Sequence, residues 1–161
     1  MTTIRPHLWY HDRAHEAAEF YTGLFPDSRI TSVVEAPPGN GELGAAPEGT
    51  PFVVEFTIAG QPVVAMSAGD IFTLNEAFSF AVQCDTQEEA DRYWEALTAD
   101  GGEESQCGWC KDRFGLSWQI VPKGVDELTM GADEASARAR AAMYGMRRLD
   151  LAALQAAYDG A

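Results

Sequence analysis

The sequence predicts an α+β protein built from two β-α-β-β-β units that are followed by C-terminal helices. The main observation is an internal repeat, because EAAEFYTGL at residues 16–24 aligns with EADRYWEAL at residues 89–97. In these two segments the Glu, one Ala and the Leu are identical, and two aromatic positions match in type. Both segments also lie in the same order of elements, with a strand before the helix and β-rich segments after it.

In the first unit, the aromatic-rich segment Ile4–Tyr10 predicts a strand, and Asp12 is placed to cap a helix after it. The helix is predicted from one apolar stripe, which consists of Ala14, Ala17, Ala18, Tyr21, Leu24 and Phe25. Residues 29–35 are rich in β-forming residues, and residues 36–50 read as a Pro/Gly loop. Residues 52–58 and 62–67 then predict a hairpin, because apolar and polar residues alternate in the first of them.

In the second unit, Phe78–Cys84 predicts a strand and Thr86 is placed to cap the next helix. The apolar stripe of that helix consists of Ala90, Tyr93, Trp94 and Leu97. Asp133 is placed to cap a further helix that extends to Arg148, and Asp150 is placed to cap another over residues 151–158. We therefore expect one domain, with module one at 1–70, module two at 75–122 and a helical tail at 123–161.

The composition limits the classes of partner. The chain has 161 residues and a net charge of −14, whereas phosphate binding needs a basic surface, so nucleic acid is not expected as a partner. The sequence has no run of about 18 apolar residues and no signal-peptide pattern at its start, so neither a membrane span nor secretion is expected. Three cysteines are too few for a disulfide scaffold, and we expect a cytoplasmic protein.

The segment QCGWCKDRFGLSWQIVP, residues 106–122, contains a C-G-W-C motif. A redox dithiol needs a helix N-terminus to lower its thiol pKa, but this motif precedes a predicted β-hairpin. A zinc site would need a second cysteine pair, and Cys84 stands alone. The sequence therefore favours packing roles for Cys107 and Cys110.

Three segments carry a family resemblance: LWYHDRAHEAAEFYTGLFPDSRI, LNEAFSF and, most specifically, CGWCKDRFGLSWQIVP. They resemble the PhnB-like branch of the vicinal oxygen chelate (glyoxalase/bleomycin-resistance/dioxygenase) superfamily, over nearly the whole chain including the tail helices. The resemblance implies two βαβββ modules whose curled mixed sheets surround a cup for a small ligand, and a homodimer. Some relatives are called 3-demethylubiquinone-9 methyltransferases, yet no glycine-rich loop follows a strand here as a nucleotide-type cofactor site requires.

In enzymes of this superfamily the cup also holds a divalent metal bound by His, Glu or Gln. Carried over by position, the ligand sites fall at Pro6, near Ala65, at Ser79 and at Gln119. Only Gln119 can ligate in that geometry, so we expect no metal cofactor. A divalent metal on a displaced set, His7, Glu55 and Gln119, stays as the alternative.

Strand alternation indicates which polar side chains face the cup. The ligand-binding candidates are Tyr10, Ser67, Asn75, Ser79, Gln83, Trp109 and Gln119. Glu55 is the catalytic candidate, since a carboxylate in a partly apolar cup would have a raised pKa and act as a base. The alternatives are that Glu55 is solvated or paired with an Arg, that Asn75 makes an Asx turn, and that Trp109 packs in a core or dimer.

Three functions remain open at this point. In the first, the chain is a small-molecule-binding protein, with or without metal-independent turnover. In the second, it is a metal-dependent lyase or dioxygenase of the glyoxalase type. In the third, it is a protein that sequesters a toxic compound, as bleomycin-resistance relatives do, and an acidic, aromatic-lined cup would then favour a cationic or aromatic ligand.

Overall fold

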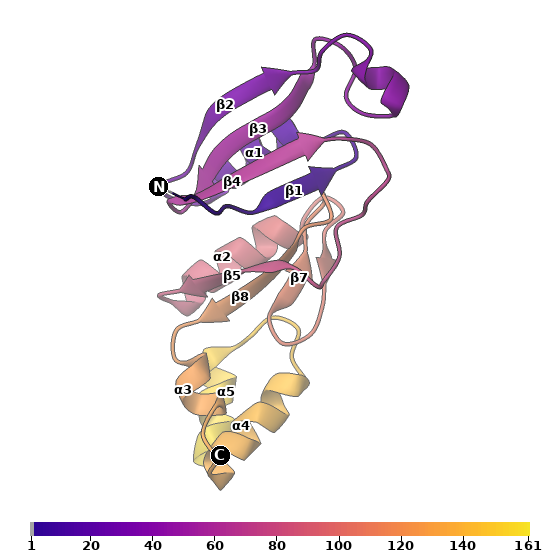
Figure 1. Ribbon diagram of the computed structural model, residues 1–161. Coiled ribbons are helices and arrows are strands. Elements are labelled where there is room, and N and C mark those ends of the chain that lie inside the picture. Colours follow the sequence, from indigo (N-terminus) through magenta and orange to yellow (C-terminus); the bar gives the residue numbers. More distant parts are fainter. Residues whose placement is uncertain (1) are drawn as a thin grey trace. The chain divides into compact units, whose positions relative to one another are not determined.

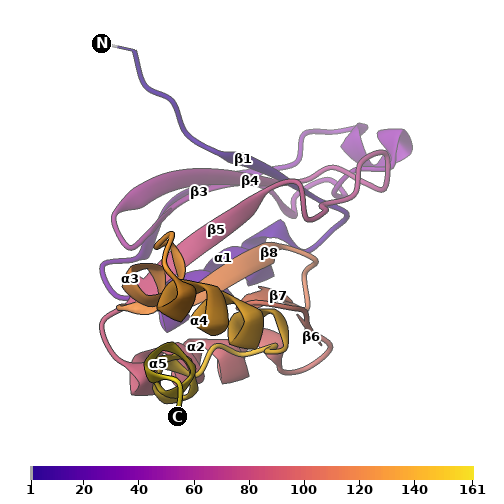
Figure 2. The same ribbon diagram turned by 90° about the horizontal axis from the view of Figure 1, so that it is seen from below.

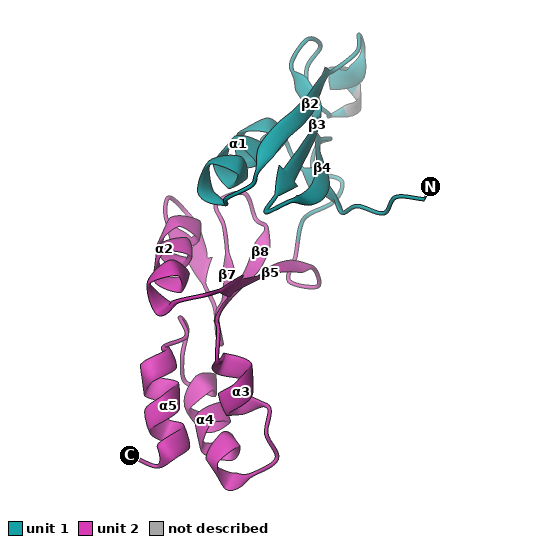
Figure 3. Cartoon of the chain, turned by 90° about the vertical axis from the view of Figure 1, so that its left-hand side faces the viewer, with its two compact units in different colours: residues 1–74 teal, residues 75–161 magenta. Residues whose placement is uncertain are grey.

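The computed structural model describes residues 2–161, apart from the side chain of Leu43. The chain divides into two compact units, Met1–Leu74 and Asn75–Ala161 (Figure 3). Each unit contains one four-stranded mixed sheet that does not close, and the described residues form five α-helices and one short 3₁₀ helix. The predicted α+β class with C-terminal helices is confirmed.

The first unit has its strands in the order β1-β4-β3-β2, with β1 parallel to β4 and the other neighbours antiparallel (Figure 1). Its elements are β1 (His7–Tyr10), α1 (Ala14–Leu24), β2 (Arg29–Glu35), the 3₁₀ helix η1 (Asn40–Leu43), β3 (Pro51–Ile58) and β4 (Gln61–Ser67). The first strand is shorter than predicted, and the loop after β2 contains η1. The hairpin of β3 and β4 is confirmed.

Helix α1 covers one face of this sheet, and the predicted apolar stripe makes the contact. Ala14, Ala17, Ala18 and Tyr21 are buried, and the Tyr21 ring stacks on Phe56 of β3 with 6.3 Å between ring centroids. Because side chains alternate along a strand, Glu55 lies on the opposite, helix-free face. The helix-covered face therefore holds the apolar core of this unit, and the other face carries Glu55.

The predicted N-cap of α1 is wrong. Arg13 occupies the cap position without a side-chain hydrogen bond, and the Ala14 amide instead donates to the Ser67 hydroxyl on β4, at 3.1 Å. The cap thus comes from a residue 53 positions away in the sequence, which local sequence rules do not detect.

The second unit repeats the arrangement, with strand order β5-β8-β7-β6 and with β5 parallel to β8 (Figure 2). Its elements are β5 (Ser79–Cys84), α2 (Gln87–Thr98), β6 (Glu103–Glu104), β7 (Trp109–Lys111) and β8 (Ser117–Pro122). Thr86 caps α2 by accepting a hydrogen bond from the Glu89 amide, and the predicted stripe of α2 is buried. Both predictions for this helix are confirmed.

The turn between β7 and β8 is organised by one buried carboxylate. Asp112 is 2% exposed, and its side chain accepts hydrogen bonds from the amides of Phe114 and Leu116 at 2.8 and 3.1 Å. It also accepts one from the indole N–H of the fully buried Trp118, at 2.8 Å. Asp112 therefore fixes both the hairpin turn and the largest core side chain of this unit.

The tail consists of α3 (Val125–Thr129), α4 (Glu134–Tyr144) and α5 (Leu151–Asp159). Asp133 and Asp150 cap α4 and α5 as predicted. The sequence analysis does not predict α3, and α4 ends at Tyr144 and not at Arg148. The tail has its own apolar cluster, formed by Val125, Leu128, Ala139, Leu149 and Leu154. No helix of the described residues has the length and apolar character needed to span a membrane.

Candidate functional site

The face of the second sheet opposite to α2 gathers polar residues that alternation predicts. The register places Ser117 between Ser79 and Lys111, and in the next row it places Gln119 beside Trp109. The Gln119 amide donates a hydrogen bond diagonally to the Ser79 hydroxyl, at 3.0 Å. This face thus brings together three of the predicted ligand-binding residues, Ser79, Trp109 and Gln119.

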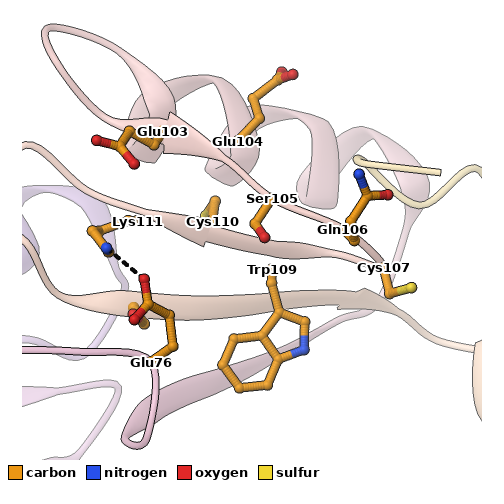
Figure 4. A pocket seen from close by; sticks show the side chains of 10 residues that line it. Glu76, Glu103, Glu104, Ser105, Gln106, Cys107, Trp109, Cys110 and Lys111 are labelled. Carbon is orange, nitrogen blue, oxygen red and sulfur yellow. Dashed lines mark ion pairs between the residues drawn. The ribbon is translucent and has the colours of Figure 1, made fainter. Parts of the chain in front are cut away.

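A pocket of about 500 Å³ lies at the β7 side of this face (Figure 4). In Figure 4 the indole of Trp109 lies on one side of the pocket, with the Lys111–Glu76 pair at one end and Gln106 and Cys107 at the other. The lining residues are Glu76, Glu103, Glu104, Ser105, Gln106, Cys107, Trp109, Cys110, Lys111 and Ser117. The pocket thus combines a large aromatic wall with several polar groups, as small-molecule sites do.

Ser117 is the unusual member of this lining. Its side chain is 1% exposed, and its hydroxyl is the one buried side-chain oxygen or nitrogen without a hydrogen-bond partner in the part of the chain described. A buried hydroxyl without a partner is costly, and such groups in native proteins call for an explanation. Since Ser117 lines the pocket, a ligand can supply the missing partner.

The charges of the pocket are unevenly paired. The Lys111 ammonium lies 2.5 Å from the Glu76 carboxylate, and this hydrogen bond lowers the pKa of Glu76 and raises that of Lys111. Glu104 points away from the pocket in Figure 4 and accepts a hydrogen bond from the Trp94 indole, at 3.0 Å. Glu103, which pairs in register with Lys111, has no ion pair within 4.0 Å in residues 2–161. The pocket therefore carries an excess of negative charge.

The cysteines of the C-G-W-C motif lie in different environments. Burial raises the pKa of Cys110 to about 12, and the same effect raises that of Cys84 to about 12. The predicted packing role of Cys110 is confirmed by its burial. Cys107 is only partly buried and lines the pocket, in a turn before β7 rather than on a strand.

The tail holds this turn in place. Cys107 and Gly108 both have left-handed backbone conformations, with φ of 56° and 83°. Their amides donate to the carbonyls of Met146 and Arg147, at 2.8 and 2.7 Å. The segment between α4 and α5 thus fixes one end of the pocket. Cys107 and Gly108 of the C-G-W-C motif form a left-handed turn, so the motif has a role in the backbone conformation as well as in packing.

The sequence-based assignments in the first unit need correction. The Tyr10 hydroxyl lies 3.0 Å from the Tyr21 hydroxyl of α1, and Ser67 holds the N-terminus of the same helix. Both side chains are buried on the helix-covered face, so their predicted orientation is wrong. Strand alternation predicts that Tyr10 and Ser67 face the cup, but their hydroxyl groups instead form hydrogen bonds inside the core.

Glu55 lies on the helix-free face as predicted, but its expected pKa is wrong. The Arg5 guanidinium donates a hydrogen bond to it at 2.7 Å, and this bond lowers the pKa of the Glu55 carboxyl. Two other predicted residues have different positions in the second unit. Asn75 accepts a hydrogen bond from the Ala77 amide, which is the Asx-turn alternative, and Gln83 is exposed on the far strand β5.

The displaced metal set is divided between the units. His7 rather than Pro6 shares the helix-free face with Glu55, because the register pairs His7 with Val64 and Val64 with Glu55. Glu55 is already bound by Arg5, and the amide nitrogen of Gln119 is bound to Ser79. Among the described residues, no group of three or more His, Cys, Asp or Glu side chains is placed to hold a metal ion.

Comparison with known proteins gives one family match. The sequence model of the 3-demethylubiquinone-9 3-methyltransferase family matches residues 2–121. The match ends before α3, so it does not include the tail helices. No curated protein matches the chain.

Solved structures share the fold. One is described as a putative 3-demethylubiquinone-9 3-methyltransferase, PhnB protein, from Bacillus cereus; it is 29% identical, with a TM-score of 0.66, over 75% of this chain and 99% of that one. A protein from Pseudomonas aeruginosa is 17% identical with a TM-score of 0.61, over 76% and 98% of the two chains. The fosfomycin resistance protein FosX from Listeria monocytogenes is 18% identical with a TM-score of 0.54, over 79% and 95%.

Proposed function

Since the chain belongs to the PhnB-like 3-demethylubiquinone-9 3-methyltransferase family, within the vicinal oxygen chelate superfamily, we propose that it is a small-molecule-binding protein. The ligand occupies the pocket beside Trp109 in the second unit. The observation that carries the proposal is the Ser117 hydroxyl, which is buried in the lining of this pocket without a partner. Ligand pockets commonly combine an apolar wall with a few such directed polar groups.

We propose that binding does not depend on the divalent metal of the superfamily's enzymes. A metal would have to displace Arg5 from Glu55, and hard divalent cations need several oxygen or nitrogen ligands. We also propose that the chain does not transfer methyl groups, despite the family's description. The glycine-rich segment 39–44 follows β2, but it leads through the short 3₁₀ helix η1 into β3 and not into the α-helix that a nucleotide-type methyl-donor site requires.

A metal-dependent lyase or dioxygenase is the second candidate function. The observation that favours it is the shared face of His7 and Glu55, which flank Val64 in the register. Metal content separates this candidate from the first. Catalytic turnover, as opposed to stoichiometric protection, separates an enzyme from a protein that sequesters a toxic compound.

We propose a cytoplasmic homodimer as the working form. The edge strand β2 supports this, because Val33 and Val34 are 41% and 52% exposed there. An uncovered edge with apolar side chains is a template for pairing with a second chain. The mass of the native complex measures the stoichiometry directly.

Cys107 offers a chemical test of ligand binding in the pocket. We expect iodoacetamide to modify Cys107 faster than Cys84 or Cys110, because those two thiols are buried. In protein isolated from its host, alkylation of Cys107 should be slower before small molecules are removed by dialysis than afterwards. Peptide mass spectrometry measures the three rates in one sample.

Cys84 and Cys110 are the internal controls for this experiment. Their modification would report unfolding rather than release of a ligand. Equal alkylation rates at Cys107 before and after dialysis would count against an occupied pocket.

A further inference from the structure

We propose that the pocket beside Trp109 selects ligands that carry a cationic nitrogen, such as an ammonium group or a protonated nitrogen heterocycle, on an apolar body. This inference rests on the proposed function and specifies the chemical class of its ligand. The described residues support it through an aromatic wall, an excess of carboxylates and an unpaired buried acceptor.

The aromatic wall is the indole of Trp109. The other tryptophans use their indole N–H groups internally: Trp9 donates to the Gly69 carbonyl at 2.9 Å, Trp94 to Glu104 at 3.0 Å and Trp118 to Asp112 at 2.8 Å. Trp109 is partly exposed and lines the pocket, so its ring is available to a ligand. Among aromatic side chains, an indole face attracts a cation most strongly.

The charge balance at the Lys111 end favours a cation over an anion. Two carboxylates, Glu76 and Glu103, act on the single ammonium of Lys111, and Glu76 already pairs with it. Glu103 is thus left to attract a second positive charge. A carboxylate or phosphate ligand would instead meet Glu103 as a like charge and would compete with Glu76 for Lys111.

Ser117 offers a hydrogen-bond acceptor to the cationic group of the ligand. Its hydroxyl is buried without a partner, and it lies beside Lys111 in the register, at the same end of the pocket as the acidic pair. A hydroxyl oxygen can accept a hydrogen bond, and an ammonium or protonated ring nitrogen donates one. The same ligand group therefore satisfies Ser117 and neutralises Glu103.

The test uses three small probes of similar shape and different charge: benzylammonium, benzyl alcohol and benzoate. Each is titrated into uniformly ¹⁵N-labelled full-length protein at pH 7 while the four indole N–H signals are observed by NMR. The Trp109→Phe variant identifies the Trp109 signal, and the three internally bonded indoles serve as controls. We expect benzylammonium to shift the Trp109 signal saturably and to bind more tightly than the other two probes.

Two variants separate local charge from overall charge. Glu103→Gln removes the carboxylate beside the pocket, and Glu127→Gln removes one from the exposed surface of α3 in the same unit. We expect Glu103→Gln to weaken benzylammonium binding by about 2- to 5-fold, which lies within the range of exposed ion pairs, and Glu127→Gln to leave it unchanged. Benzyl alcohol should bind equally to all three proteins.

The outcomes distinguish this inference from the function on which it rests. If benzyl alcohol or benzoate shifts the Trp109 signal at lower concentration than benzylammonium does, the cationic class is wrong while binding at the pocket stands. If no probe shifts it, the cationic class is wrong as well, and the alkylation of Cys107 in host-derived protein decides separately whether the pocket holds a ligand.

Discussion

Replacing Asp112 by alanine is expected to lower the free energy of unfolding of the second unit by about 3–5 kcal/mol, because it leaves buried donors without an acceptor. The Trp118 indole and the amides of Phe114 and Leu116 all donate to this carboxylate. Urea unfolding followed by tryptophan fluorescence measures the change.

Two substitutions give the scale for this effect. Asp112→Asn keeps one acceptor oxygen and should cost less than Asp112→Ala. Asp126→Ala removes an exposed carboxylate from α3 and should change stability by no more than about 0.5 kcal/mol. If Asp112→Ala proved as mild as Asp126→Ala, the hairpin would not depend on the buried carboxylate.

Replacing Gly108 by alanine is expected to destabilise the second unit by about 2–4 kcal/mol, because overpacking and backbone strain add together. A Cβ at Gly108 would lie 2.8 Å from the Ile120 carbonyl oxygen and 2.9 Å from a methyl group of Leu149. Its φ of 83° is also one that residues with a Cβ rarely adopt. The same urea unfolding experiment measures the loss.

Gly115 is the matched control, since its φ is 89° but a Cβ there would meet nothing within 4 Å. Gly115→Ala should therefore show only the strain of a left-handed residue, about 1–2 kcal/mol. The difference between the two variants isolates the contact with Leu149 and the Ile120 carbonyl. Equal losses of unfolding free energy in the two variants would mean that Leu149 of the tail does not pack closely against the turn at Gly108.

The sequence predicts the elements that depend on local patterns. The internal repeat indicates two similar units, and the stripes on α1 and α2 are buried as expected. Thr86, Asp133 and Asp150 cap their helices because an N-cap bond spans only three residues. Asp12 does not cap α1 because the helix begins at Ala14, which makes Arg13 the N-cap residue, and because the Ala14 amide donates to Ser67, far away in the sequence.

The site was harder to predict because it depends on partners that are distant in sequence. Alternation correctly placed Ser79 and Gln119 on one face, but it could not show that Tyr10 finds Tyr21 in the core. Nor could it reveal that Ser117, on the same strand as Gln119, lacks a partner. Whether a polar side chain is satisfied depends on its three-dimensional neighbours, which residue type and strand position do not specify.

The pocket was missed for a similar reason. Glu76, Glu103 and Lys111 come from three separate segments, so no local sequence pattern brings them together. The sequence favoured packing roles for both cysteines of the C-G-W-C motif; Cys110 is buried, but Cys107 is only partly buried and lines the pocket. The motif lies at the pocket because the amides of Cys107 and Gly108 donate hydrogen bonds to the tail carbonyls of Met146 and Arg147, and these long-range contacts cannot be predicted from the motif itself.

The central claim is that the second unit binds a small organic molecule without a metal. Native mass spectrometry of the protein isolated from its host tests it most directly, with a Trp109→Ala variant isolated in the same way as the control. We expect the wild-type protein to carry an organic adduct that the variant has lost, and neither protein to carry a divalent metal. A stoichiometric divalent metal on the wild-type protein, or an organic adduct retained in full by Trp109→Ala, would contradict the account.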